Sequence, residues 1–245
     1  IPRKELTPKP LYRLPLYLFL FLLVFSSCNS AEKTPNQQEK RPRQQFAQKI
    51  ISKEQKVPIY LDVELSPTAY ISWVKNSDNH LNKNNTILDI RYGINYLPLD
   101  YMLCNELKKT RVSEKELEEL KQEYSGMEYF ELKIEALGFN DELAKYQLQS
   151  QGQYQERIKY LAFDMQKDIF LKTDDNRQVP CKLYHFERTY GVTPHSTFLL
   201  GFSKEDIATS KERTIVIDDK LFNKGLVKFN WTELALNNVP KLSVI

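Results

Sequence analysis

The second half of the chain is a succession of short segments in which apolar and polar residues alternate. In residues 129–135, for example, Phe130, Leu132 and Ile134 alternate with charged residues. A two-residue period puts alternate side chains on opposite faces of a strand. Further strand candidates, separated by turn residues, are 157–164, 168–173, 179–189, 196–202, 213–218 and 226–231. Many short strands at fairly regular spacing predict a mainly β fold, an antiparallel immunoglobulin-like β-sandwich.

The preceding half is less uniform. Residues 57–65 and 86–96 also alternate and are predicted strands, although a helix stays open for the second because residues 97–104 are apolar too. Residues 113–124 predict a helix, since Ser113 and the glutamate three positions later fit a capping box.

Two domain organisations fit this pattern. In one, a single sandwich carries residues 97–125 as a helical insertion; in the other, a mixed strand and helix region, 46–125, precedes a separate β-sandwich region, 126–245. Residues 141–149 could add a helix among the strands.

The N-terminal part contains an unbroken apolar run, LPLYLFLFLLVF, at residues 14–25. Basic residues precede it and two serines follow it. A basic start, a short apolar core and small residues are the parts of a secretory signal peptide, predicted for residues 1–27. The run is shorter than the roughly 20 apolar residues that a membrane helix needs.

Phe25-Ser26-Ser27-Cys28 resembles the lipobox of bacterial lipoproteins, and the Asn- and Lys-rich, Gly-poor composition is similar to that of Bacteroidota. Phe25 stands where leucine is commoner. The resemblance implies removal of residues 1–27 and acyl chains on Cys28, which would anchor the chain stably to a bacterial membrane of the cell envelope, at the outer membrane on its periplasmic or surface side. Residues 28–45 are polar and predict a flexible tether.

The charge argues against a nucleic-acid partner. The net charge of +3 includes the basic leader, so the mature chain is close to neutral, whereas nucleic-acid binding requires a strongly basic face. Only seven glycines are present, which gives little support to a glycine-rich phosphate loop, and no cofactor is predicted.

Two cysteines, Cys104 and Cys181, remain once Cys28 is assigned to lipid. An even pair in an exported protein suggests a disulfide. Two buried free thiols are the equally open alternative.

Few residues suggest catalysis or metal binding. Cys181 and His185 would share a face of one strand, and His195 follows the next turn, which keeps open a hydrolase of envelope polymers. The same two histidines, facing each other across a hairpin, could join His80 in a zinc site, although no HxxxH or CxxC spacing supports it.

Clustered carboxylates raise the question of calcium. They occur at Asp174-Asp175-Asn176 and at Asp218-Asp219. Asp and Asn are also ordinary turn residues, and the turn interpretation is favoured.

Aromatic residues are the remaining indication of function. Such residues are enriched in binding patches and are equally common in sandwich cores. The candidates are Tyr92, Tyr96, Tyr101, Tyr184, Tyr190 and Trp231. The leading hypothesis is a non-enzymatic, membrane-anchored envelope lipoprotein that binds an envelope protein or a glycan. The alternatives are the hydrolase and a toxin-immunity lipoprotein.

Overall fold

The computed structural model describes residues 59–108 and 111–243, which belong to one unit. The predicted signal peptide, Cys28 and the tether lie outside the described residues.

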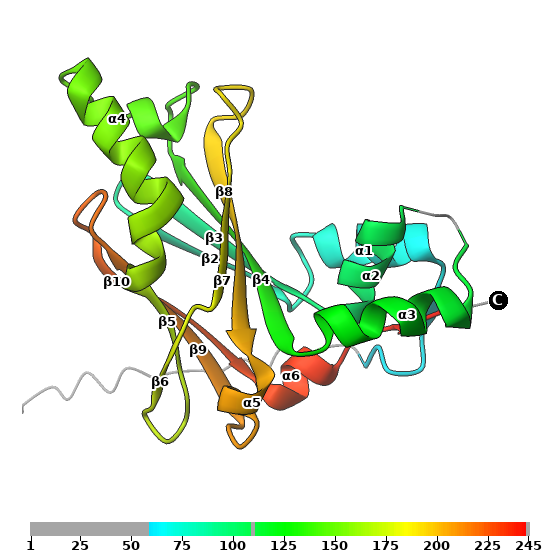
Figure 1. Cartoon of the computed structure of the whole chain (residues 1–245). Helices are drawn as coiled ribbons and strands as arrows, with labels where there is room; N and C mark the ends of the chain where they lie inside the picture. Colours follow the sequence, from blue (N-terminus) through cyan, green and yellow to red (C-terminus); the bar gives the residue numbers. More distant parts are fainter. Residues whose placement is uncertain (1–58, 109–110, 244–245) are drawn as a thin grey trace, which may run out of the picture. The chain divides into compact units, whose positions relative to one another are not determined.

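The larger sheet has five antiparallel strands in the order β2-β3-β4-β8-β7 (Figure 1). Its strands are β2 (Asn82–Ile87), β3 (Ile90–Leu97), β4 (Met127–Ala136), β7 (Leu183–Glu187) and β8 (His195–Ser203). Because β3 pairs directly with β4, this sheet includes strands from both sides of the 125/126 boundary.

A second antiparallel sheet has four strands in the order β10-β9-β5-β6. They are β5 (Ile169–Lys172), β6 (Gln178–Pro180), β9 (Glu212–Asp219) and β10 (Gly225–Thr232). A short parallel pair joins β1 (Glu64–Leu65) to β11 (Lys241–Leu242), so the ends of the described chain meet.

One hydrophobic core receives side chains from both large sheets. Ile90, Tyr92 and Ile94 of β3 are buried in it together with Ile215 and Ile217 of β9. The alternation in the sequence therefore correctly indicates which side chains enter the core, and the mainly β, antiparallel fold is confirmed.

Polar contacts join the two sheets at both ends of β9. At one end the Arg213 guanidinium lies 3.1 Å from the Glu128 carboxylate of β4, with both side chains nearly buried. At the other end the Tyr92 hydroxyl donates a hydrogen bond of 2.7 Å to Asp219. Buried polar groups of this kind stabilise the fold only when both partners are present.

Helices lie between the strands and beside the sheets. They are α1 (Pro67–Lys75), α2 (Leu99–Leu107), α3 (Glu114–Tyr124), α4 (Gln151–Lys159), α5 (Lys204–Ile207) and α6 (Glu233–Asn237). The first three group together, whereas α4 lies apart from them (Figure 1). The capping box is confirmed, since Ser113 caps α3 and Glu116 reaches back to its backbone.

The predicted strand at 157–164 is wrong. The chain there is helical, from α4 through a π-helical turn (Tyr160–Asp164) and a 3-10 turn (Met165–Asp168). Ile158, Leu161 and Met165 recur at helical spacing and pack in or against the core, which the two-residue alternation obscured. Within residues 141–149, where a helix was considered, only one 3-10 turn forms, Leu143–Lys145.

Two further predictions need correction. Only Glu64–Leu65 of the described part of 57–65 is a strand, and the preceding Leu61 and Val63 are exposed. Residues 179–189 split between the two sheets at Cys181 and Lys182, which link β6 to β7.

Candidate functional site

The outer face of the five-stranded sheet is the side turned away from the core. On β3 it carries Arg91, Gly93 and Asn95, which alternate with the buried residues of that strand. The register places Gly93 between Asn84 of β2 and Lys133 of β4. The face is therefore polar across three neighbouring strands.

A groove of about 220 Å³ lies on this face, here called the Gly93 groove. Its walls come from β2, β3 and β4, from the C-terminal end of α1 and from the first residue of β8. The polar and charged residues that line it include Lys75, Asn82, Asn84, Arg91, Asn95, Glu131, Lys133 and Glu135.

Gly93 keeps the centre of this groove open. A Cβ atom on Gly93 would lie 2.8 Å from Oδ1 of Asn84 on the neighbouring strand. Glycine is disfavoured inside strands, so its presence here fits a close approach between neighbouring groups. The missing side chain lets the Asn84 amide lie over the strand.

Asn95 contributes a buried acceptor without a partner. Its side chain is 6% exposed, and Nδ2 donates to the Val74 carbonyl at 3.1 Å. Oδ1 accepts no hydrogen bond within the described part of the chain. An unsatisfied buried acceptor costs about 1–3 kcal/mol.

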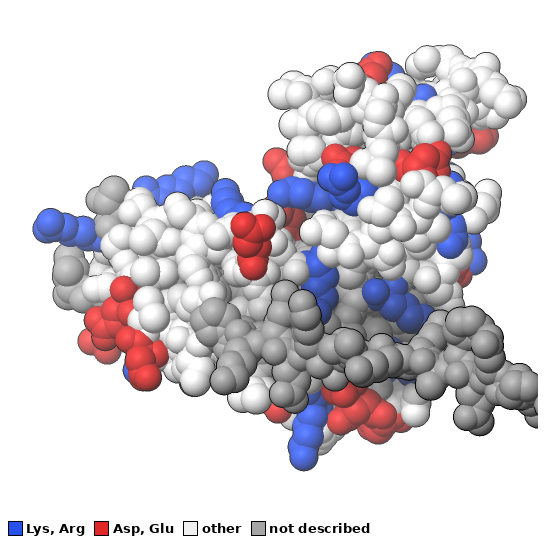
Figure 2. All heavy atoms as spheres, turned by 180° about the vertical axis from the view of Figure 1, so that it is seen from behind, with Lys and Arg blue, Asp and Glu red and all other residues white. Residues whose placement is uncertain are grey.

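Four charged side chains of the groove form two ion pairs, and Lys75 at the end of α1 also lines it. Arg91 lies 2.7 Å from Glu135 on the next strand, and Lys133 lies 2.8 Å from Glu131 on its own strand. All four side chains are partly exposed. Over the face of the molecule drawn in Figure 2, basic and acidic groups are likewise interspersed rather than gathered by sign.

Asparagine amides fix the rim of the groove. Asn79 accepts a hydrogen bond from the Leu81 backbone and donates to the Trp73 carbonyl, while Asn82 donates to the Asn76 carbonyl at 2.7 Å. The Asn-rich stretch thus holds the end of α1 against the start of β2.

A second hollow of about 210 Å³ lies on the other side of Glu131, which lines both. Its walls include Tyr101, His185, Glu187 and Thr197.

The sequence could have indicated the Gly93 groove only through an alignment of the polar positions of β3 and β4. Such an alignment requires that the pairing of these two strands is already known.

The predicted catalytic residues do not come together. Cys181 precedes β7 and is buried in the core, whereas His185 is exposed on the outer face. The same-face expectation is wrong because the strand begins only at Leu183. Burial raises the pKa of the Cys181 thiol to about 11, opposite to the lowered pKa of reactive cysteines.

The predicted histidine pairing is also wrong. The β7–β8 hairpin forms, but its register places His185 opposite Leu199, and His195 pairs with Glu135 of β4. His80 lies elsewhere, with Nε2 2.9 Å from the Ala235 carbonyl. Among the described residues no three His, Cys, Asp or Glu side chains group to hold a metal ion.

Cys104 and Cys181 are both free and buried. The free-thiol alternative therefore describes this pair in the structure. Cys104 lies within α2, whereas Cys181 belongs to the main core, where its Sγ lies 2.9 Å from the Leu183 carbonyl.

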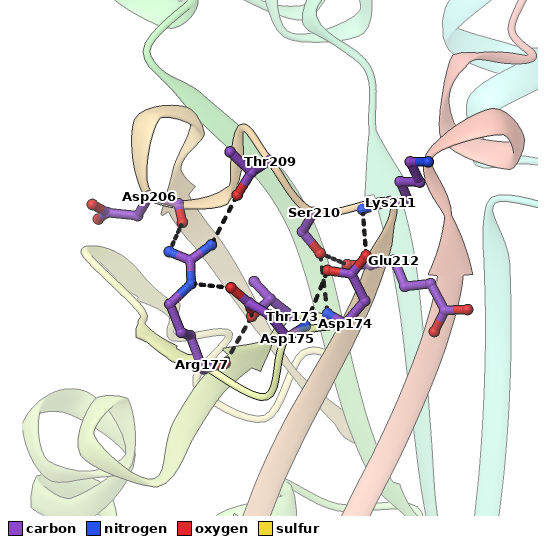
Figure 3. A network of polar contacts seen from close by, with 9 residues as sticks. All are labelled: Thr173, Asp174, Asp175, Arg177, Asp206, Thr209, Ser210, Lys211 and Glu212. Atoms are coloured by element: carbon purple, nitrogen blue, oxygen red, sulfur yellow. Dashed lines mark hydrogen bonds and ion pairs between the residues drawn. The ribbon is translucent and has the colours of Figure 1, made fainter.

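The aspartates considered for calcium are held by the protein. Figure 3 shows the turn after β5, where Asp175 accepts from Thr173 and Arg177, and Asp174 accepts from the Lys211 backbone at 3.1 Å. These hydrogen bonds lower the pKa of both carboxyl groups.

The second aspartate pair also has protein partners. Asp219 accepts hydrogen bonds from Tyr92 and from the backbone of Leu221, and Asp218 pairs with Lys220. Both aspartate clusters thus stabilise turns.

The aromatic residues do not form one exposed patch. Tyr92, Tyr101 and Trp231 are buried, and Tyr96 and Tyr184 pack against the core. For these five residues the core interpretation therefore holds. Tyr190 alone of the six is well exposed, at 74%, with the Arg188 guanidinium stacked on its ring.

Comparison with protein-family models, curated proteins and solved structures finds no match for this chain. None of the helices within residues 59–108 and 111–243 has the length and apolar character needed to cross a bilayer.

Proposed function

We propose that this chain is a non-enzymatic lipoprotein of a bacterial cell envelope, anchored through Cys28, that binds an envelope component in the Gly93 groove. The observation that carries the binding role is the groove itself, which Gly93 keeps open at its centre and which asparagine and charged residues line. Binding sites commonly combine a concave surface with a few well-placed polar groups. The paired charges support a partner other than nucleic acid.

We also propose that the fold is an immunoglobulin-like sandwich. Two antiparallel sheets around one core support an immunoglobulin-like sandwich. Such sandwiches serve many functions, so the groove, and not the fold, carries the functional argument.

Binding can be tested without the lipid. The mature chain carrying Cys28→Ser would be mixed with isolated envelopes of the producing organism and sedimented. The groove variant is Gly93→Val, which displaces Asn84, and its matched control is Gly126→Val, where a Cβ would meet nothing within 4 Å. We expect the parent and the control to sediment with envelopes and the groove variant to lose most of this binding. Equal sedimentation of all three would contradict the proposal.

The anchor is tested separately. Intact mass of the protein extracted from membranes should correspond to residues 28–245 plus acyl chains, and a Cys28→Ala variant should leave the membrane fraction. A mass that begins elsewhere and carries no lipid would contradict the anchor and leave the groove prediction standing.

One observation favours toxin immunity, or another protein partner, as a second candidate. Leu88 is exposed in the turn between β2 and β3, and Tyr190 is exposed in the loop between β7 and β8. Both have a left-handed backbone, with φ of 57° at Leu88 and 52° at Tyr190. Residues held in sparsely populated backbone conformations cluster at functional sites. If the partner is a protein of the envelope that contacts these two loops, a Leu88→Ser, Tyr190→Ser double variant will lose envelope binding while Gly93→Val retains it.

A further inference from the structure

The charges that line the Gly93 groove do not cancel. Among the described residues of its walls, three are basic and two are acidic. We infer that the groove binds an acidic glycan of the envelope through one singly charged group, a carboxylate or a phosphodiester. This inference rests on the proposed binding function and adds the class of ligand. The charged residues are Lys75, Arg91, Lys133, Glu131 and Glu135.

Lys75 supplies the charge that has no counterpart. It is the last residue of α1, is exposed, and forms no ion pair with any residue that the structure describes. The other two basic side chains, Arg91 and Lys133, lie 2.7 Å and 2.8 Å from glutamate oxygens. One negative charge on the ligand would therefore balance the groove, and such complementarity favours a matching partner over others.

Arg91 keeps hydrogen-bond donors for an oxyanion. Its Nη1 donates to Glu135 at 2.7 Å, whereas Nε and Nη2 have no acceptor among the residues that the structure describes. A guanidinium carries five N–H donors in a planar fork, which matches the oxygens of a carboxylate or a phosphate. The exposed amide of Asn84 adds N–H donors beside Gly93. The groove can thus bind an oxyanion while the pair between Arg91 and Glu135 stays in place.

The glutamates limit how much charge the ligand can carry. Glu135 lies beside Arg91, and Glu131 also lines the second hollow together with Glu187. Closely spaced phosphates, as in a nucleic-acid backbone, would bring further negative charges near these carboxylates, and like charges repel each other. A polymer with isolated acidic groups among neutral units avoids this repulsion.

The groove offers little to a protein partner. Protein interfaces take most of their binding energy from aromatic or apolar anchors seated in desolvated pockets. Ile94 is the one apolar residue among the described residues that line the groove, and it is 2% exposed. A glycan needs no such anchor, because its hydroxyl groups can bind the amide and charged side chains of the walls.

The first test removes the charge of Lys75 from the Cys28→Ser mature chain and measures sedimentation with isolated envelopes. The matched control is Lys228→Met, since Lys228 is exposed on β10, lies outside the groove and forms no ion pair with a described residue. We expect Lys75→Met to weaken binding about tenfold and Lys228→Met to leave it nearly unchanged, with melting temperatures close to that of the parent chain. Lys75→Arg keeps the charge and should retain most of the binding.

Two outcomes of this test would overturn the inference and leave the proposed function standing. Equal losses in both methionine variants would mean a general attraction between the basic chain and the envelope. Full binding by Lys75→Met, together with loss in Gly93→Val, would mean that the groove binds a ligand without using this charge. Failure of the parent chain to bind untreated envelopes would instead contradict the function itself.

The second test changes the envelopes. Proteinase removes proteins, a carbodiimide with methylamine converts carboxylates into uncharged amides, and aqueous hydrofluoric acid cleaves phosphodiesters. We expect binding to survive proteinase and to fall about tenfold after one of the two chemical treatments, which then identifies the acidic group. Loss after proteinase would overturn the glycan assignment in favour of a protein partner. Retention after both chemical treatments would overturn the assignment of a charged ligand.

Discussion

The two faces of the five-stranded sheet are formed by the same strands but differ in their side chains and in what these contribute. Toward the core, Tyr92 ends in a hydrogen bond to Asp219, surrounded by interlocking apolar side chains. On the outer face the neighbouring positions hold Gly93 and Asn95, and the Asn95 carbonyl has no hydrogen-bond partner among the residues that the structure describes. The inner face stabilises the fold. The outer face contains a strand glycine and an unsatisfied buried carbonyl, which both lower stability, and such local costs are typical of functional sites.

The largest expected difference concerns ion pairs on the two sides. Arg213→Met leaves Glu128 buried and unpaired, and we expect a loss of about 3–5 kcal/mol in the free energy of unfolding. Arg91→Met breaks an exposed pair and should cost about 0–1 kcal/mol. Urea denaturation of both variants measures this, and equal losses would contradict the contrast between the faces.

Adjacent residues of β4 sharpen the comparison. Leu132 is fully buried, so Leu132→Ala should cost about 2–5 kcal/mol through lost contacts and a cavity. Its neighbour Lys133 points outward, and Lys133→Ala should stay within about 0.5 kcal/mol. Thermal unfolding followed by circular dichroism separates the two, and a reversed order would mean that the register of β4 is wrong.

Removal of the Tyr92 hydroxyl should lower the free energy of unfolding by a smaller amount. Tyr92→Phe deletes a hydrogen bond to a buried carboxylate that keeps its backbone donors, and we expect a loss of about 1.5–3 kcal/mol. On the outer face, Asn95→Leu removes one hydrogen bond together with the unsatisfied carbonyl and should cost less. Denaturation midpoints of the pair decide this, and a larger loss at Asn95 would show that its amide serves stability.

The smallest effect concerns pH at the turn between β2 and β3. Hydrogen bonds from Lys224 and Tyr146 lower the pKa of Asp89 to about 2. Its stabilising contribution should be complete above the ordinary pKa of about 4 and should disappear as the pH falls through about 2. Asp89→Asn should therefore lower the melting temperature at pH 7 and lose this effect near pH 2. A constant difference at all pH values would contradict the role assigned to the carboxylate.

Much of the sheet follows directly from the sequence. Strands β4 and β10 alternate because one face packs on the core, whereas β5, β8 and β9 are short apolar runs between turn residues. Helix α3 is indicated by the capping box of Ser113 and Glu116. The α4 region was misread because Ile158 and Leu161 sit among polar residues that fit either period locally. The hairpin turn at Leu88 was missed, since a leucine with positive φ is contrary to the usual turn preferences.

The site was less accessible to sequence analysis than the fold. Asn84, Gly93 and Lys133 become neighbours only through the pairing of β2 with β3 and of β3 with β4, across an insertion of two helices. The aromatic residues are a stronger signal in the sequence, yet most of them are buried in or against the core. Small polar residues on the outer face of a sheet do not by themselves indicate a groove. Whether they lie together depends on the register in which their strands pair.

The most direct test of the binding surface is a map of backbone amide chemical shifts of the Cys28→Ser mature chain, recorded with and without solubilised envelope glycan fragments. The account predicts that the largest shifts cluster at Asn84, Gly93 and Asn95 and are absent from Gly93→Val. Shifts that cluster instead on the outer face of the four-stranded sheet, or at Leu88 and Tyr190, would contradict it.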